Sequence, residues 1–194
     1  MTGTTQTSSQ TGYLVGHLLV AMPQMTDPRF HESVILMCNH DEKGAMGIVI
    51  NKVIDSISFE DLLKQLNIAL PNKSLSFKIH FGGPVEIGRG FVLHSTDYSN
   101  PLSKAVTKEI SLSATTTIIE DCIQGQGPKQ VLIALGYAGW GTGQLESEIM
   151  KNGWLTVEAD PNLIFSEDAL SIWRRTLEKM GITLENLSTS SGHA

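Results

Sequence analysis

The chain has 194 residues, a formal net charge of −6 at neutral pH and 41% hydrophobic residues. This length and hydrophobic content suffice for one compact domain, or for two small ones that share an interface. The acidic balance argues against direct nucleic-acid binding, because nonspecific affinity for DNA comes largely from Lys and Arg side chains that replace counterions on phosphates.

The two ends and the cysteines indicate where the domain lies and in which compartment it works. Residues 1–12 are polar and are expected to form a disordered or tag-like leader, and residues 13–194 to form a single domain. No apolar run approaches the roughly 20 residues that cross a bilayer, so no membrane partner is expected. Cys38 and Cys122 lack C-x-x-C spacing and lie among apolar residues. They predict two buried, reduced thiols in a cytoplasmic protein.

The first half of the chain predicts mainly strands. Segments 14–20, 33–39 and 46–51 have strand composition, and the polar link 40–45 makes a hairpin of the last two. The two hairpin strands are apolar along most of their length instead of alternating. We therefore expect a sheet with both faces covered.

One helix and two further strands follow. Ser58 is expected to cap the helix, with Asp61 three residues later and an apolar stripe at helical spacing after it. Strands are expected over 77–81 and 91–94. Between them, Gly82-Gly83-Pro84 predicts a stiff turn whose backbone is unobstructed by side chains.

The second half predicts alternating strands and helices. Segment 107–112 alternates, with Thr107, Glu109 and Ser111 on the polar face of a strand. A short helix over 115–123 and a strand over 154–158 are expected on either side of a glycine-rich segment. Ser166 is expected to cap a last helix that ends at Gly181. The buried stripe of that helix is predicted to be Ala169, Leu170, Trp173, Leu177 and Met180.

Segment 131–148 is predicted to form a strand, a glycine loop and a helix. An apolar run over 131–135 is followed by four glycines, and Leu145 and Ile149 then take up helical spacing. Two interpretations stay open. The glycines could expose backbone N–H groups at a helix N-terminus to a small anion, with Gln144 adding donors, or they could let the chain pack closely around Trp140.

Known catalytic and cofactor motifs do not fit this segment or any other. The third glycine of a dinucleotide fingerprint counted from Gly139 is replaced by Gln144, and no Gly-Lys-Ser/Thr occurs for a Walker loop. No cofactor is therefore predicted. The six histidines have no metal-ligand spacing, so no metal is expected either. His94 and His193 are the weak candidates for a catalytic general base.

Several blocks together resemble the bacterial AlgH/YqgE family. They are Gly16 to Pro23, Gly44 to Asn51, Gly82-Gly83-Pro84, Leu93-His94, Gly136 to Glu148, Trp154, Trp173 and Gly192-His193-Ala194. The resemblance implies an α+β fold with a branched, partly barrel-like β-sheet flanked by helices. The lack of an internal repeat or low-complexity linker predicts a single compact unit, of either one or two lobes. The resemblance also implies a bacterial cytoplasmic protein. The family is often labelled as transcriptional regulators, but it has no recognised catalytic residues.

The sequence therefore predicts a binding or regulatory module more readily than an enzyme. Its partner is expected to be a small, anionic molecule or another protein. The predicted site comprises Asn51, Gly82, Gly83, Pro84, Gly139, Trp140, Gly141 and Gln144. The alternatives are a hydrolase or transferase with a histidine base and, disfavoured by the charge, direct transcriptional regulation.

Overall fold

The structure, a computed structural model, describes residues 13–71 and 75–183. In this part of the chain a nine-stranded, mainly antiparallel sheet runs in the order β6-β7-β5-β8-β3-β2-β1-β9, and β4 pairs with β8 off this path. The strands on the β3 side are β1 (His17–Ala21), β2 (Val34–Asp41), β3 (Gly44–Val49) and β9 (Trp154–Glu158). Those on the other side are β4 (Ile79–Phe81), β5 (Val85–Ser95), β6 (Lys104–Ala105) and β7 (Ile110–Ser113).

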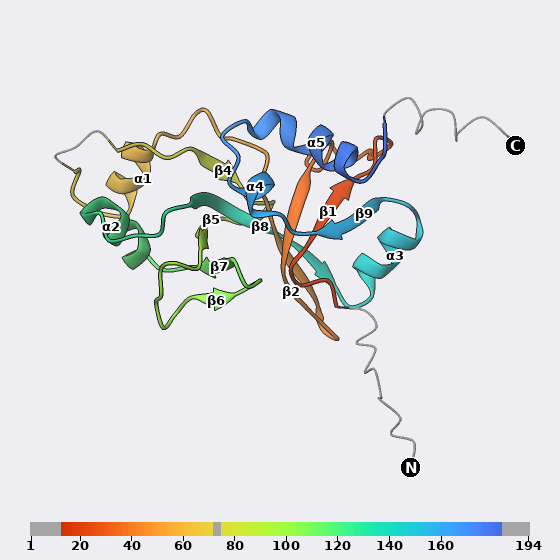
Figure 1. Cartoon of the computed structure of the whole chain (residues 1–194), viewed down its shortest axis with the longest axis horizontal. Helices are drawn as coiled ribbons and strands as arrows, with labels where there is room; N and C mark the ends of the chain where they lie inside the picture. Colours follow the sequence, from red (N-terminus) through yellow and green to blue (C-terminus); the bar gives the residue numbers. More distant parts are fainter. Residues whose placement is uncertain (1–12, 72–74, 184–194) are drawn as a thin grey trace, which may run out of the picture.

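Strand β8 (Val131–Gly141) joins the two halves of the sheet. Its first half pairs with β5 antiparallel and with β4 parallel, whereas its second half pairs with β3. The change of partners falls at Gly136, whose φ of 72° is a conformation that glycine adopts without steric cost. Figure 1 shows β8 crossing the middle of the molecule between these two groups of strands. The sheet is therefore branched and curled, and the fold predicted from the family resemblance is confirmed.

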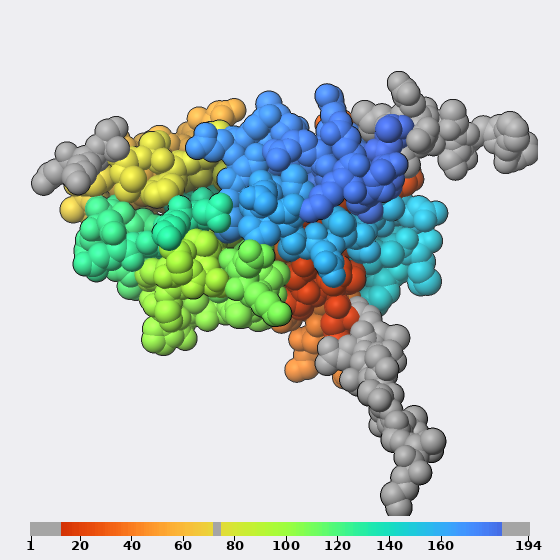
Figure 2. Space-filling model, viewed as in Figure 1, coloured from red at the N-terminus to blue at the C-terminus, as the bar shows by residue number. Residues whose placement is uncertain are grey.

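Five α-helices flank the sheet within the described residues. They are α1 (Phe59–Gln65), α2 (Thr117–Gln124), α3 (Gln144–Met150), α4 (Pro161–Ile164) and α5 (Ile172–Lys179). Helices α4 and α5 cover one face of β1 and β2, and α3 covers the other face. Helices α1 and α2 pack with β4, β5 and β8 at the opposite end of the molecule. Figure 2 shows the blue C-terminal segment over the middle of the molecule, between the green and cyan segments.

Most elements lie close to their predicted places. The hairpin of β2 and β3 is present, and every residue of β2 from Val34 to Cys38 is fully buried, which confirms that both faces of this sheet are covered. Helix α1 begins as predicted: the Ser58 hydroxyl accepts a bond from the Asp61 N–H, and the Asp61 carboxylate accepts one from the Ser58 N–H, at 3.1 Å each. This reciprocal pair satisfies two N–H groups of the first turn.

Two predictions for the second half are wrong. Segment 107–112 does not alternate between a polar and an apolar face: β7 begins only at Ile110, and all four of its residues are buried between β5 and β6. The last helix is not capped by Ser166. A 3₁₀ turn (Ala169–Ser171) precedes α5, and because three residues per turn shift the helical phase, Leu170 is 92% exposed instead of buried.

Candidate functional site

The two glycine-rich segments predicted as backbone cradles pack against each other. A Cβ atom at Gly82 would lie 2.2 Å from the carbonyl oxygen of Gly136, and one at Gly83 would lie 2.0 Å from the carbonyl carbon of Tyr137. Real side chains do not tolerate such distances. These contacts support the packing interpretation for Gly82 and Gly83, which let the turn before β5 lie directly on β8.

The predicted loop after residue 135 is instead the second half of a strand. Residues 136–141 continue β8, and Gly44 to Gly47 of β3 pair with Ala138 to Gly141. Only Thr142 and Gly143 separate the strand from α3. The glycines make this pairing possible, because a Cβ at Gly44 would lie 2.2 Å from the carbonyl oxygen of Trp140.

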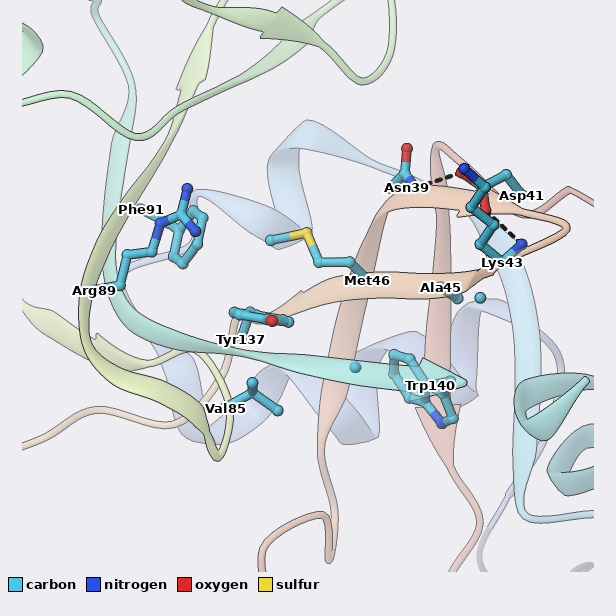
Figure 3. A pocket seen from close by; sticks show the side chains of 12 residues that line it. Asn39, Asp41, Lys43, Ala45, Met46, Val85, Arg89, Phe91, Tyr137 and Trp140 are labelled. Carbon is cyan, nitrogen blue, oxygen red and sulfur yellow. Dashed lines mark hydrogen bonds between the residues drawn. The ribbon is translucent and has the colours of Figure 1, made fainter. Parts of the chain in front are cut away.

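The second half of β8 borders two hollows, and Gly139 and Trp140 line both of them. The first, which we call the open groove, has a volume of about 570 Å³ and is bounded by β3, β5 and β8. Figure 3 shows its central side chains, Met46 and Tyr137, between Arg89 on one side and the β2–β3 hairpin on the other.

The second hollow, which we call the indole pocket, has a volume of about 360 Å³. Four predicted site residues line it: Pro84, Gly139, Trp140 and Gln144. The remaining lining residues that matter for its chemistry are Arg29, Phe30, Glu148, Lys151 and Trp154.

Glu148 holds the two indole rings of this pocket in place. Its Oε2 atom accepts hydrogen bonds from the Nε1–H groups of Trp140, at 2.9 Å, and Trp154, at 2.8 Å. Its Oε1 atom accepts a bond of 3.0 Å from the Gln144 amide. The two indoles meet edge to face at 6.1 Å, and Phe30 meets Trp154 in the same way at 5.7 Å. One carboxylate thus fixes a rigid aromatic wall.

The side chain of Gln144 is engaged at both ends within the chain. Its Oε1 atom accepts a bond of 3.0 Å from the Gly141 N–H, in addition to the bond that its amide gives to Glu148. The next residue but one, Glu146, accepts a bond of 2.8 Å from the buried His40. A hydrogen bond from its own backbone N–H and the bond from His40 lower the pKa of Glu146. The first turn of α3 therefore carries the Glu146 carboxylate, and the side-chain amide of Gln144 is already hydrogen-bonded within the chain.

The two basic residues of the indole pocket are Arg29 and Lys151, and neither lies in the first turn of α3. Arg29 contacts the Asp27 carboxylate through two nitrogens, at 2.7 and 3.0 Å, and lies 5.7 Å from the Phe30 ring centroid. This bond to Arg29 lowers the pKa of Asp27. Lys151 follows the last turn of α3, and its exposed side chain makes no ion pair with the described residues.

The other predicted residues lie elsewhere. Asn51 is buried, and its side chain accepts a bond from the Val34 N–H and donates one to the Glu32 carbonyl, each at 2.8 Å. It therefore ties the start of β2 to the loop before it. His94 pairs with Val131, ten residues before Gly141 on β8 and roughly 30 Å away at strand spacing. His193 lies outside the described residues.

His94 is fully buried in a hydrogen-bond chain. Its Nδ1 donates to the Ser95 carbonyl, and its Nε2 accepts from the Ser113 hydroxyl, each at 3.0 Å. The Ser113 hydroxyl in turn lies 2.6 Å from the Ser103 hydroxyl. These bonds account for both ring nitrogens.

Burial lowers the pKa of both His94 and His80. The unfolded chain then binds protons that the folded chain does not, so stability should be constant above the unfolded histidine pKa of about 6.5 and should fall as the pH drops below it. We expect the urea midpoint to decrease between pH 7 and pH 5, and His94→Gln to reduce that decrease. An equal pH dependence in the unmodified protein and in His94→Gln would contradict the assignment.

The described residues contain no group of three or more His, Cys, Asp and Glu side chains able to hold a metal ion. Among the helices of residues 13–71 and 75–183, none has the length and apolarity to cross a bilayer.

Sequence reasoning missed the residues that organise the indole pocket. Glu148 reads as a surface residue that could pair with Lys151, and Phe30 and Arg29 lie in an unremarkable loop. No spacing in the sequence brings together positions 30, 140, 148 and 154. The only hint is that two tryptophans and a glutamate fall in one short stretch.

Comparison with known proteins gives consistent matches over nearly the whole chain. The sequence profile of the family described as AlgH-like matches residues 18–185. A UPF0301 protein of Cereibacter sphaeroides is 49% identical over 182 residues, which cover 93% of this chain and 99% of that protein. A UPF0301 protein of Rhodospirillum rubrum is 47% identical over 183 residues, covering 94% of this chain and 95% of that protein.

Two solved structures have a similar fold. The solution structure of the AlgH protein from Pseudomonas aeruginosa superimposes with a TM-score of 0.77 at 36% identity, covering all of both chains. The crystal structure of a Corynebacterium diphtheriae protein gives a TM-score of 0.69 at 18% identity, covering 84% of this chain and 85% of that one. The second match concerns the fold alone.

Proposed function

The chain belongs to the AlgH-like family, and we propose that it is a binding module that takes a small, flat, anionic ligand in the indole pocket. The observation that carries this proposal is the shared bond of both indole N–H groups to Glu148. A ligand pocket is typically a mainly apolar hollow with a few placed polar groups, and it is usually formed before the ligand arrives. The fixed aromatic wall has these properties.

Two carboxylates, Asp27 and Glu148, and two cations, Arg29 and Lys151, line the pocket, and the one of these four side chains that makes no hydrogen bond or ion pair with the described residues is a cation. Glu148 is already bonded to two indoles and an amide, and Asp27 is bonded to Arg29. Lys151 remains as a cation without a partner among the described residues. A ring stacked on the aromatic wall and a carboxylate or phosphate directed to Lys151 would use both features.

Two further considerations support a cytoplasmic binding role. Both Cys38 and Cys122 are free thiols, as expected for a protein of a reducing compartment. The net charge of −6 disfavours direct DNA binding, so any regulatory effect is proposed to pass through the ligand or through a protein partner at the same pocket.

The indole resonances of the three tryptophans test the small-ligand proposal. In a titration with benzoate followed by ¹H–¹⁵N NMR, the Nε1–H signals of Trp140 and Trp154 should shift in a saturable way. The signal of Trp173 should stay in place, because this residue of α5 is buried against β1, and its indole donates to the Ala21 carbonyl. Lys151→Gln should weaken benzoate binding about fivefold.

The matched control is Lys64→Gln, which removes an exposed lysine from α1, remote from the pocket. It should leave the affinity unchanged. Benzyl alcohol should bind more weakly than benzoate, because it lacks the charge. Absence of saturable shifts at Trp140 and Trp154 would contradict the small-ligand proposal, and equal effects of the two lysine substitutions would contradict the role of Lys151.

A further inference from the structure

Strand β9 ends the strand order of the sheet on the side of β1, so one of its two edges has no neighbouring strand. Natural sheets usually protect such an edge with a very short strand, a lysine or a proline, because its backbone groups can pair with another chain. The opposite end of the order is protected in this way: β6 has only two residues and begins with Lys104. Strand β9 has five residues and contains neither lysine nor proline. Its edge is therefore open to a further strand.

Two hydrogen bonds at the ends of β9 show which of its backbone groups face outward. The Met22 N–H donates to the Gly153 carbonyl at 3.1 Å, and the Ala159 N–H donates to the Gly16 carbonyl at 3.0 Å. Both bonds continue the antiparallel register of β1 and β9. Because bonded and non-bonded pairs alternate along such a ladder, residues 155 and 157 also bond to β1. The N–H and C=O groups of the other residues of the strand point away from β1: Trp154, Thr156 and Glu158.

The outward backbone groups of β9 have no hydrogen-bond partner among the described residues. The side chains of Thr156 and Glu158 are exposed as well. A row of free N–H and C=O groups is the template on which another strand adds to a sheet. This edge is therefore a surface for pairing with a further strand.

The outward groups are arranged symmetrically about Thr156. Trp154 lies two residues before it and Glu158 two residues after it. When a second copy of β9 is placed antiparallel, with Thr156 opposite Thr156, an outward residue stands opposite an outward residue at every such position. Each of these pairs can exchange two hydrogen bonds. The edge of β9 therefore matches itself over its whole length.

The side chains match in the same register. On the face of the sheet that α3 covers, Thr156 stands opposite Thr156, a pair that stabilises antiparallel strands. On the face that α5 covers, the half-buried Leu155 stands opposite Val157. The exposed Lys151, just before β9, is brought toward the end of the other strand that carries Glu158. Neither of these two charges makes an ion pair with a described residue, so the ends of the two strands are complementary.

We propose that β9 pairs with β9 of a second copy of this chain, which joins the two sheets into one continuous sheet in a symmetric dimer. The strand supplies five residues from each copy, whereas a standard interface uses about 20 to 30 residues a side. The dimer is therefore weak, with a Kd of about 0.1 to 1 mM. It uses the backbone of Trp154, whereas the indole pocket uses its side chain, so either proposal can fail without the other.

Amide hydrogen exchange of the full chain at two protein concentrations tests this proposal. At about 2 mM the outward amides of Trp154, Thr156 and Glu158 should exchange about threefold more slowly than at about 50 μM, because they are bonded in the dimer. The amides of Leu155 and Val157 are bonded to β1 in both states, and their exchange should not depend on concentration. This alternation along one strand identifies the edge that pairs.

A proline at the centre of the edge should prevent the pairing. Thr156→Pro removes the central outward N–H but no bond to β1, and proline is tolerated in an edge strand where its nitrogen faces outward. It should weaken dimer formation at least about tenfold, as measured by sedimentation velocity. The matched control, Thr156→Val, keeps the N–H and the β-branched shape and should leave the Kd within about twofold of that of the unmodified protein.

Cross-linking tests the register without depending on the stability of the proline variant. In a bonded pair the Cα atoms lie about 5.5 Å apart, within the range of about 4.4 to 6.8 Å that a disulfide spans, so Thr156→Cys should form a disulfide-linked dimer under mild oxidation. In the control Glu158→Cys the two Cα atoms lie roughly 13 Å apart in this register, so this variant should stay monomeric on a non-reducing gel. Cys38 and Cys122 are present in both variants.

Three results would overturn the proposal: a monomer at every concentration up to about 2 mM, equal cross-linking of Thr156→Cys and Glu158→Cys, or slow exchange of the outward amides that does not change with concentration. The last result would assign the edge of β9 to another segment of the same chain, such as residues 184–194.

Discussion

Gly83→Ala should destabilise the protein by about 4 kcal/mol, which is among the largest effects expected of a single substitution. A Cβ atom at this position would lie 2.0 Å from the carbonyl carbon and 2.2 Å from the carbonyl oxygen of Tyr137. Both are backbone atoms of β8 and cannot turn aside. The φ of 151° at Gly83 adds a second cost, because a residue with a side chain rarely adopts it.

Strand β5, which follows this turn, offers a matched control. Gly88 lies five residues later in the chain, and a Cβ atom there would meet nothing within 4 Å. Gly88→Ala should change the free energy of unfolding by no more than about 0.5 kcal/mol, or stabilise slightly by restricting the unfolded chain. Urea denaturation of both variants provides the measurement. A small effect of Gly83→Ala would show that the turn before β5 can move away from β8, and would contradict the packing described for this junction.

The comparison of these glycines explains why the sequence could predict the fold better than the site. A run of apolar residues predicts a strand wherever it occurs, so β1, β2, β3 and β9 lie close to the predicted segments. Glycines carry no such information. Gly83 and Gly88 look alike in the sequence, but one is enclosed by backbone and the other is open to a pocket.

The start of α5 shows a related limit. The apolar spacing from Ala169 to Met180 is compatible with one continuous helix, and Ser166 precedes it like a cap. A 3₁₀ turn interrupts that spacing, and the hydroxyl of Ser166 accepts a bond from Arg175 instead. Local propensity cannot decide between these outcomes, because the packing of α4 and α5 on β1 sets the phase of the helix.

The predicted site residues lie only partly together. Pro84, Gly139, Trp140 and Gln144 line one pocket, whereas the backbone of Gly82 and Gly83, predicted to be exposed, packs against β8. These residues lie together because the turn before β5 packs on β8, which is a contact between segments more than 50 residues apart. The residue pattern of a short segment cannot predict such a long-range contact.

Glu148→Leu should cost about 3 kcal/mol, because it leaves the indole N–H groups of Trp140 and Trp154 without their common acceptor. Both tryptophans are buried, with 7% and 3% of their surface exposed. An unpaired buried donor costs about 1 to 3 kcal/mol, and two are created at once. Glu178→Leu, which replaces an exposed glutamate of α5, should change the free energy of unfolding by less than about 0.5 kcal/mol.

A double-mutant cycle separates the hydrogen bonds from the other effects of removing Glu148. In a Trp154→Phe background one of the two donors is absent, so Glu148→Leu should cost about 1 kcal/mol less than in the unmodified protein. Hydrogen exchange at the Trp140 Nε1–H should accelerate in Glu148→Leu, since the bond of 2.9 Å that protects it is lost. Benzoate binding should fall in parallel, because the aromatic wall is no longer fixed in place. An additive cycle with unchanged indole exchange would mean that Glu148 does not hold the two rings, and the proposed pocket would lose the feature on which its ligand binding depends.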